Sequence, residues 1–392
     1  MSEKIYSEYI ERAKEILSQM TLDDKILQMS IYEDLNVVYD EFKEKGEIEL
    51  RAGTFHNPIE EKNLNELQDY CVNKTKLGIP LMPATESLHG VQDEDSTVFP
   101  QCAGLGGSFD REAIGEMADI IGNEARAKGI RQVYAPCVDI PRDPRWGRLQ
   151  ESYGEDVLLN SAFGVAYVKA LEGSGVVTTP KHFVDNYGEG GHDSYPSPTS
   201  WRVLREVYLE PFRACFQEGG SRSVMSAYNT IDGVPVSCND QLLNEILKKE
   251  WGFDGYVVCD YHAVGIIKSG QFMAETHEDA LAMSVNNGLD LELMNTHEGL
   301  LQLVKDGKIS EETINESVRR ILKVKFELGL FEEPFVNAKK AAEVVRCDEH
   351  RALAEEAARK CMTLLKNNGI LPLDINKVKK IGIYGPGANE LC

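Results

Sequence analysis

Short apolar runs alternate with longer amphipathic stretches along most of the chain. Because each run is apolar at consecutive positions, it is typical of a strand buried on both faces, as in a parallel sheet. Strands separated by helix-length segments predict βα units. The candidate strands are "IPLMPA" (79–84), "QVYAPCVDI" (132–140), "GVVTTP" (175–180), "SVMSAY" (223–228), "YVVCD" (256–260) and "LDLELM" (289–294).

Two of the intervening segments carry clear helix signals. Residues 110–129 place Ile114 and Met117 on one face, and Gly129 can end the helix. Residues 239–252 begin with an asparagine that can cap a helix and end with two lysines that suit its negative end. Both segments fit the crossover helices that parallel strands need.

Polar side chains stand at or just past the ends of these strands. In a (β/α)8 barrel, the loops at the carboxyl ends of the strands build the active site. We therefore predict an α/β fold with a (β/α)8 TIM-like barrel over residues 1–335 and a site at this rim. The rim residues are Glu86, Arg148, Lys181, His182, Tyr228, Asn229 and Asp260.

Asp260 is the sharpest of these signals, because the apolar run 256–259 stops on its carboxylate. Burying an acid at the end of a strand costs desolvation unless a site needs the charge. The alternative is that Asp260 caps the helix predicted to follow, a common role for aspartate.

The barrel pattern ends near residue 330. We expect residues 336–375 to form a linker and a helix that lead out of the barrel. Residues 376–392 then contain a candidate strand, "KIGIYG", which we expect to begin an incomplete second α/β domain.

Charge and composition narrow the function. The chain has 392 residues with 64 acidic and 42 basic side chains, a net charge of −22, which disfavours nucleic acid and anionic membranes as partners. The amino-terminal segment has no signal-peptide pattern, and no apolar run has the length of a membrane span. The nine cysteines occur singly, without zinc-ligand spacing. We therefore expect a cytoplasmic protein with free thiols and no metal.

The segment "RDPRWGR" (142–148) has two readings. Arg142 and Arg145 fit a structural knot around Asp143, whereas Arg148 can offer a bidentate fork to sugar hydroxyls or to a carboxylate. The other rim residues also have structural alternatives. Lys181 and His182 could be surface residues, Tyr228 a core tyrosine and Glu86 a first-turn helix acid.

Taken together, these segments resemble glycoside hydrolase family 3, the β-glucosidase and β-xylosidase type. The resemblance runs through nearly the whole chain and keeps the family's motif order. It rests on "ESLHG", "RDPRWGRLQESYGED", "KHF", "REVYLEPFRACFQEGGSRSVMSAYNTIDGVPVSCN", "WGFDGYVVCDY", "NGLDLE" and "LLKNNGILPL".

The resemblance implies a barrel followed by an α/β sandwich domain, here incomplete, and a role for each rim residue. Asp260 matches the catalytic nucleophile of a retaining β-glycosidase, which forms a covalent glycosyl-enzyme. Arg148, Lys181 and His182 match residues that bind hydroxyls of the terminal sugar. Glu86 falls where the family holds the far edge of that sugar, and Tyr228 matches a tyrosine beside the nucleophile. The cations nearby should favour the ionised form of Asp260.

A retaining glycosidase also needs an acid/base carboxyl. In two-domain family members this is a glutamate of the second domain, so we expect it from a longer product or from a complementing chain. A single-domain branch, the β-N-acetylhexosaminidases, instead uses a His–Asp dyad in the loop after "KH". Here that loop contains His192, Asp193 and Ser194, but its sequence is more similar to the glucosidase and xylosidase type. His192 is a candidate sugar contact or an exposed loop histidine.

The expected substrate is a β-linked oligosaccharide or glycoside, with no cofactor. Glu86 stands where many glucosidases have aspartate, which leans toward a xylosidase, but one methylene discriminates by only about 1–3 kcal/mol. We place β-glucosidase slightly ahead of β-xylosidase. The alternative from another class is a catalytically silent barrel that binds a monosaccharide, and a homo-oligomer remains open.

Overall fold

The computed structural model describes most of the chain, with short gaps. The described residues are 3–32, 34–47, 52–57, 59–93, 95–293, 298–385 and 388.

Among the described residues, pairing and isolated bridges join eight parallel strands into a closed ring. Six of them pair in the order β11-β1-β2-β3-β4-β5, and β7 pairs with β10. Two isolated parallel bridges, Phe183 to Ser226 and Val258 to Leu291, join these groups. The strands are β1 (Ser30–Tyr32), β2 (Thr54–His56), β3 (Met82–Thr85), β4 (Gln132–Val133), β5 (Val177–Thr178), β7 (Ser223–Ser226), β10 (Tyr256–Cys259) and β11 (Glu292–Leu293).

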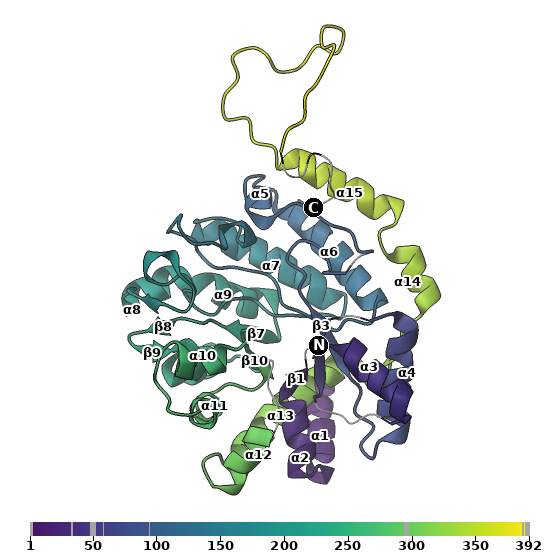
Figure 1. The fold of residues 1–392 in the computed structure, drawn as a ribbon, viewed down its shortest axis with the longest axis vertical. Coiled ribbons are helices and arrows are strands. Elements are labelled where there is room, and N and C mark those ends of the chain that lie inside the picture. Colours follow the sequence, from purple (N-terminus) through teal and green to yellow (C-terminus); the bar gives the residue numbers. More distant parts are fainter. Residues whose placement is uncertain are drawn as a thin grey trace.

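Helices follow the strands and surround the ring (Figure 1). They include α3 (Leu35–Lys45), α4 (Glu61–Lys74), α5 (Cys102–Gly106), α6 (Arg111–Ala127), α7 (Val157–Gly173), α10 (Ala263–Ser269), α11 (His277–Asn286), α12 (Glu298–Lys305) and α13 (Glu311–Glu327). The segment 201–219 is helical through α8 (Trp201–Val203), α9 (Glu210–Ala214) and the π-helical turns after each, and Gln241–Glu250 is π-helical. The predicted α/β fold of alternating strands and helices is confirmed.

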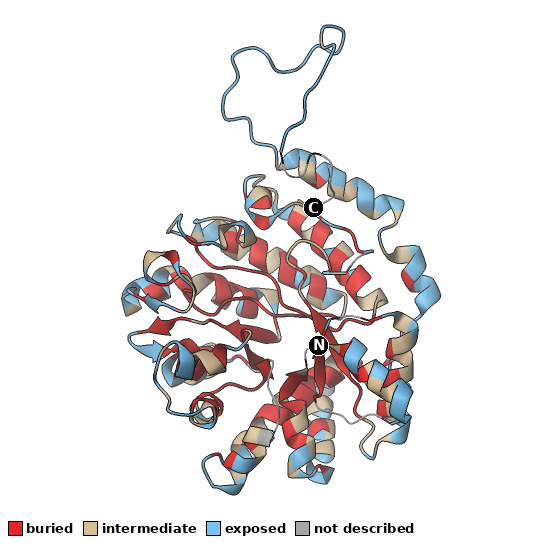
Figure 2. Cartoon of the chain, in the orientation of Figure 1, coloured by how far each residue is buried: buried red, intermediate tan, exposed pale blue. Residues whose placement is uncertain are grey.

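The predicted local signals appear in the structure. The Asp110 carboxylate accepts a hydrogen bond from Ala113 N at 3.0 Å to cap α6, and Gly129 follows that helix with φ 84°. Asn239 Oδ1 accepts from Leu242 N at 3.2 Å at the start of the next predicted helix. All four residues of β10 are fully buried, as a parallel strand covered on both faces requires (Figure 2).

Two helices precede the first strand and two follow the last barrel helix. α1 (Glu3–Gln19) and α2 (Leu22–Gln28) pack on α13. α14 (Ala338–Val344) and α15 (Asp348–Lys360) lie along α6 on the outside of the ring (Figure 1).

The strand predicted at residues 380–385 is wrong for this structure. That segment has no regular secondary structure and no partner strand, and Ile381, Ile383 and Tyr384 are exposed. Its alternating apolar residues have β propensity, but a strand is stable only when its backbone groups pair with a neighbour.

Among the described residues, no helix is both long enough and apolar enough to cross a membrane. The eight described cysteines are free thiols, as expected from their spacing.

Candidate active site

Asp260 lies directly after β10 at the carboxyl-end rim. Its side chain is 4% exposed, and its Oδ1 accepts a hydrogen bond from Tyr261 N at 2.7 Å. Helix α10 begins only at Ala263, and its N-cap residue is His262. The alternative that Asp260 caps this helix is therefore wrong, because the capping position lies two residues further on.

The second oxygen of Asp260, Oδ2, has no hydrogen-bond partner in the structure. It lies 3.9 Å from Arg148 Nη1 and 3.5 Å from His182 Nε2. Burial raises the pKa of Asp260 to about 6, although Arg148, Lys181 and the Tyr228 hydroxyl act to lower it. The cations were expected to dominate, but desolvation outweighs them, and Asp260 is still mostly ionised at pH 7.

Arg148 joins three neighbours at this rim. Its Nε and Nη2 donate to the two carboxylate oxygens of Glu151 at 2.7 and 2.9 Å. Its Nη2 also lies 2.7 Å from His182 Nε2, and its Nη1 lies 3.4 Å from Asp193 Oδ2. Burial lowers the pKa of Arg148, but Glu151 more than compensates, so the guanidinium stays charged.

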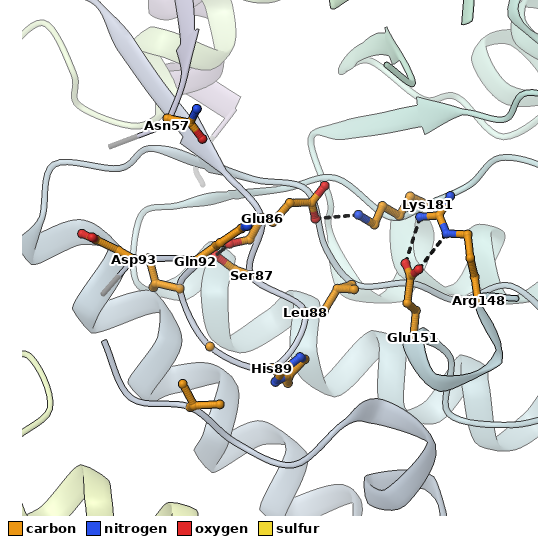
Figure 3. Close-up of a pocket in the computed structure, with 13 residues that line it drawn as sticks. Asn57, Glu86, Ser87, Leu88, His89, Gln92, Asp93, Arg148, Glu151 and Lys181 are labelled. Atoms are coloured by element: carbon orange, nitrogen blue, oxygen red, sulfur yellow. Dashed lines mark hydrogen bonds and ion pairs between the residues drawn. The ribbon is translucent and has the colours of Figure 1, made fainter. Parts of the chain in front are cut away.

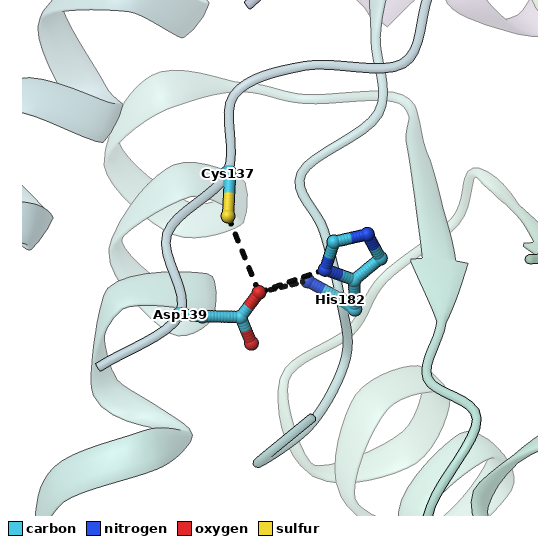
Figure 4. A group of neighbouring side chains, drawn as sticks. All are labelled: Cys137, Asp139 and His182. Atoms are coloured by element: carbon cyan, nitrogen blue, oxygen red, sulfur yellow. Dashed lines mark hydrogen bonds and ion pairs between the residues drawn. The ribbon is translucent and has the colours of Figure 1, made fainter. Parts of the chain in front are cut away.

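The imidazole of His182 is fully buried between Arg148 and Asp139. Its Nδ1 lies 2.8 Å from Asp139 Oδ2, and its backbone N–H donates to the same oxygen at 3.0 Å (Figure 4). Cys137 Sγ donates to that oxygen at 3.3 Å. Burial, Arg148 and Lys181 hold the pKa of His182 well below its usual value, so the ring is neutral. Cys137, Asp139 and His182 are donor types that bind metals, yet hydrogen bonds already occupy Oδ2.

Buried Lys181 and half-buried Glu86 form an ion pair that lines a cavity (Figure 3). Lys181 Nζ lies 2.6 Å from Glu86 Oε2. Burial acts to lower the pKa of Lys181, but the Glu86 carboxylate raises it, so the lysine is charged. Two side chains from different strand ends, β3 and β5, therefore meet with opposite charges at one wall.

The cavity has a volume of about 820 Å³ and opens beside this ion pair. Asp260 does not line it directly but adjoins it through Arg148, 3.9 Å away. The lining residues are Asn57, Glu86, Ser87, Leu88, His89, Gly90, Val91, Gln92, Asp93, Val98, Arg148, Glu151 and Lys181.

Tyr228 completes the group from the loop after β7. Two side chains hold its backbone: Asn186 Oδ1 accepts from Tyr228 N at 3.3 Å, and Gln271 Nε2 donates to Tyr228 O at 2.6 Å. Burial and the neighbouring Asp260 raise the pKa of Tyr228, so its hydroxyl keeps its proton and can donate it to the carboxylate.

His192 lies apart from these residues. Its side chain is exposed, and its ring packs on Tyr195 with centroids 4.6 Å apart. The adjacent Asp193 is the residue of this loop that reaches the site, since it contacts Arg148 and accepts from Trp146 Nε1 at 2.5 Å. A sugar contact by His192 stays a prediction.

Sequence reasoning missed Asp139 and Glu151, and it named Asp193 only in the comparison with the His–Asp dyad, not as a partner of Arg148. Asp139 carried a usable signal, because it interrupts the apolar run 132–140 much as Asp260 ends its own run. Glu151 stands three residues after Arg148 in the same motif. Asp193 carried none, because its partner is 45 residues away.

Residues 21–324 match the model of the glycosyl hydrolase family 3 N terminal domain. The chain belongs to this family.

Relatives match this chain over about half of their own length. The chain is 38% identical over 359 residues to a β-xylosidase of Formosa agariphila, covering 85% of this chain and 49% of that protein. It is 33% identical over 395 residues to a periplasmic β-glucosidase of Salmonella typhimurium, covering 96% and 50%. The β-glucosidase of Listeria innocua in complex with glucose superposes with a TM-score of 0.84 at 32% identity, covering 93% and 53%. The chain therefore spans about half the length of the relatives it matches.

Proposed function

We propose that this chain is the nucleophile-bearing half of a retaining, exo-acting β-glycosidase that acts on terminal β-D-glucosyl residues. One observation carries the proposal. A buried carboxylate with an unpartnered oxygen, Asp260 Oδ2, lies within 4 Å of Arg148 and His182 at the strand ends. A carboxylate with a free lone pair and adjacent donors suits attack on an electrophilic carbon.

In the proposed reaction Asp260 Oδ2 attacks the anomeric carbon and the bond to the leaving oxygen breaks. The leaving oxygen takes a proton from a general acid, and the sugar remains as an ester on Asp260. Water, deprotonated by the same group, then attacks the anomeric carbon and releases the sugar with Asp260 as a carboxylate. Asp260 must be ionised to attack, and burial opposes this by raising its pKa to about 6. The same burial strengthens the interaction of the carboxylate with the positive charge that develops on the sugar.

The cations and acids around Asp260 would bind the terminal sugar. Lys181 and Glu86 offer a donor and an acceptor side by side, the pattern that sugar hydroxyls require. Arg148 has donors directed toward Asp260 and the cavity. We expect these polar groups to favour a sugar with the contacting hydroxyls intact, because an analogue lacking such a hydroxyl would leave Lys181 or Glu86 with one hydrogen bond fewer.

We further propose that the acid/base is a carboxyl outside the described residues, on a second domain of the same product or on a complementing chain. The mechanism requires two carboxyls about 5–5.5 Å apart. The half-length match to the relatives supports this arrangement.

A second candidate substrate is a β-xyloside. Glu86 and the 38% identity to the Formosa β-xylosidase favour it. The longer glutamate leaves less room beside Lys181 for a hydroxymethyl group. Labelling rates with the 2,4-dinitrophenyl 2-deoxy-2-fluoro derivatives of the β-glucoside and the β-xyloside, compared in wild type and Glu86→Asp, test this, and the xyloside should be labelled relatively more slowly in the variant.

The proposed role of Asp260 is tested with leaving groups of different acidity. A 2,4-dinitrophenyl 2-deoxy-2-fluoro-β-glucoside needs no protonation to leave, so the chain should be labelled on Asp260 without any acid/base. The p-nitrophenyl β-glucoside should turn over far more slowly. Mass spectrometry of a peptide digest locates the label.

The matched control is Asp240→Asn, an exposed carboxyl next to the barrel. It should be labelled like wild type, whereas Asp260→Asn should not be labelled. Glucose binding without any label would favour the silent sugar-binding barrel. Labelling at another residue would overturn the nucleophile assignment.

A further inference from the structure

The two ring nitrogens of His182 have close polar neighbours of opposite charge, and Nε2 also lies 3.5 Å from Asp260 Oδ2. Nε2 lies 2.7 Å from Arg148 Nη2, whereas Nδ1 lies 2.8 Å from Asp139 Oδ2. A guanidinium can only donate, so Nε2 must accept. The single proton of the neutral ring must then sit on Nδ1 and point at Asp139.

Asp139 is built to hold that proton in place. It is 3% exposed, and its Oδ2 accepts from the backbone N–H and from the ring of the same histidine. Rotation of the imidazole would therefore break its hydrogen bond from Nδ1 to Asp139 Oδ2. Oδ1 has no partner, so a proton taken up there would leave Oδ2 as an acceptor. The role of Asp139 thus survives a change in its own charge.

The charged groups facing His182 come from four places on the rim. They are Asp139 after β4, Arg148 in the following loop, Lys181 beside it in sequence and Asp260 after β10. Arg148 and Lys181 both disfavour a doubly protonated, positively charged ring. The remaining question is which of the two ring nitrogens carries the single proton.

We propose that Asp139 is a positioning residue. It holds His182 as the neutral Nδ1–H form, whose Nε2 receives Arg148 and keeps the guanidinium beside Asp260. If the proton moved to Nε2, two donors would face each other across 2.7 Å and Arg148 would have to move. Asp260 would then lose its nearest cation. The effect on Asp260 rests on the proposed function, whereas the state of the ring does not.

The ring state can be measured directly. In protein with ¹⁵N-labelled histidine, the His182 signals are those that disappear in His182→Asn. We expect wild type to carry its proton on Nδ1 at pH 7. A wild-type ring protonated on Nε2, or on both nitrogens, would overturn the proposal whether or not the chain is active.

The variants separate positioning from bulk stability. Asp139→Ala should lose the Nδ1–H form and slow labelling by the dinitrophenyl fluoroglucoside at least tenfold, and should move the midpoint of its pH profile upward. Asp139→Asn keeps an oxygen acceptor, so it should restore most of the rate and the wild-type midpoint. Asp143→Asn is the matched control, since Asp143 lies in the same loop but pairs with exposed Arg145, and it should behave as wild type.

The outcomes are distinguishable from failure of the proposed function. If wild type itself is not labelled, the glycosidase proposal fails and the ¹⁵N spectra alone decide the role of Asp139. If wild type is labelled and Asp139→Ala keeps both the Nδ1–H signals and the wild-type pH midpoint, Asp139 is not a positioning residue. Circular dichroism checks the fold of each variant, and an unfolded Asp139→Ala leaves the decision to the wild-type spectrum.

Discussion

At the scale of single residues, the reactivity of Asp260 should depend on one proton. Burial raises its pKa to about 6, and only the carboxylate can attack. We expect the rate of labelling by the dinitrophenyl fluoroglucoside to be half-maximal near pH 6, to fall about tenfold per pH unit below it and to be flat above it. A profile flat down to pH 4 would mean that the attacking group is a less buried acid.

The same burial means that ionised Asp260 lowers the free energy of unfolding. Its folded pKa of about 6 exceeds the ordinary value of 3.8, so the folded state binds more protons between these values and stability falls as pH rises through them. At pH 8 we expect Asp260→Asn to raise the free energy of unfolding by about 2–3 kcal/mol, from about 1.36 kcal/mol per pKa unit. At pH 4 the gain should nearly vanish. Urea denaturation of wild type and Asp260→Asn at pH 8 and pH 4 measures this difference in unfolding free energy. A difference that is equal at the two pH values would exclude the charge of Asp260 as its cause.

Site residues could be predicted from the sequence where a residue's chemistry and its position in a motif indicated the same role. An acid ending an apolar run marked Asp260, and the structure links it by contact to Arg148 and His182. The partners of Arg148 could not be read from the sequence in the same way. Asp193 meets it only because the loop after β5 folds back over the rim, which no local pattern encodes.

At the scale of elements, a buried lysine of α13 forms hydrogen bonds that hold this helix against the barrel. Lys325 Nζ donates to Gln28 Oε1, Gly53 O and Pro80 O at 2.9, 2.9 and 3.0 Å. These three acceptors match the three donors of an ammonium group and tie α13 to α2 and to the segments entering β2 and β3. Helix periodicity predicts a buried face but cannot tell that this face carries a lysine's charge.

That fastening should make stability depend on alkaline pH. Burial lowers the pKa of Lys325 to about 7, below its usual 10.5, so between these values the unfolded chain binds more protons than the folded one. The free energy of unfolding should therefore rise by about 1 kcal/mol per pH unit from pH 7.5 to 9.5 relative to Lys325→Met. The exposed Lys339→Met is the control and should track wild type. Parallel curves for wild type and Lys325→Met would contradict the burial effect.

The order of elements was predictable because apolar runs and helix signals recur with the βα period, and the closed ring follows from it. The loops between elements were harder. The small sheet of β6 (Pro196–Ser197), β8 (Thr230–Ile231) and β9 (Val234–Pro235) brings two rim loops together, yet its strands are two residues long. Segments this short carry no usable alternation, so packing alone decides them.

At the scale of the whole molecule, the segment after α15 is unlike the rest of the chain. Most of its large apolar side chains are exposed, with Leu365, Ile375 and Tyr384 at 92%, 86% and 94%. Figure 1 shows this part leaving the barrel as an open loop. Contiguous exposed apolar groups in water favour association, even on a chain whose net charge of −22 opposes it.

The exposed apolar side chains after α15 predict that residues 364–392 promote self-association but contribute little to the stability of the barrel. A chain ending at residue 363 should keep its melting temperature within a few degrees, because the described part of the removed segment makes little buried contact. Its sedimentation coefficient should become independent of concentration, whereas the full chain should associate more as concentration rises or as salt screens its charge. Leu365→Glu, Ile375→Glu and Tyr384→Glu combined in the full-length chain should reproduce the effect, since charge replaces the apolar groups without shortening the chain. Association that persists in both forms would place the contact on the barrel itself, and a large fall in melting temperature would show that the segment packs on it.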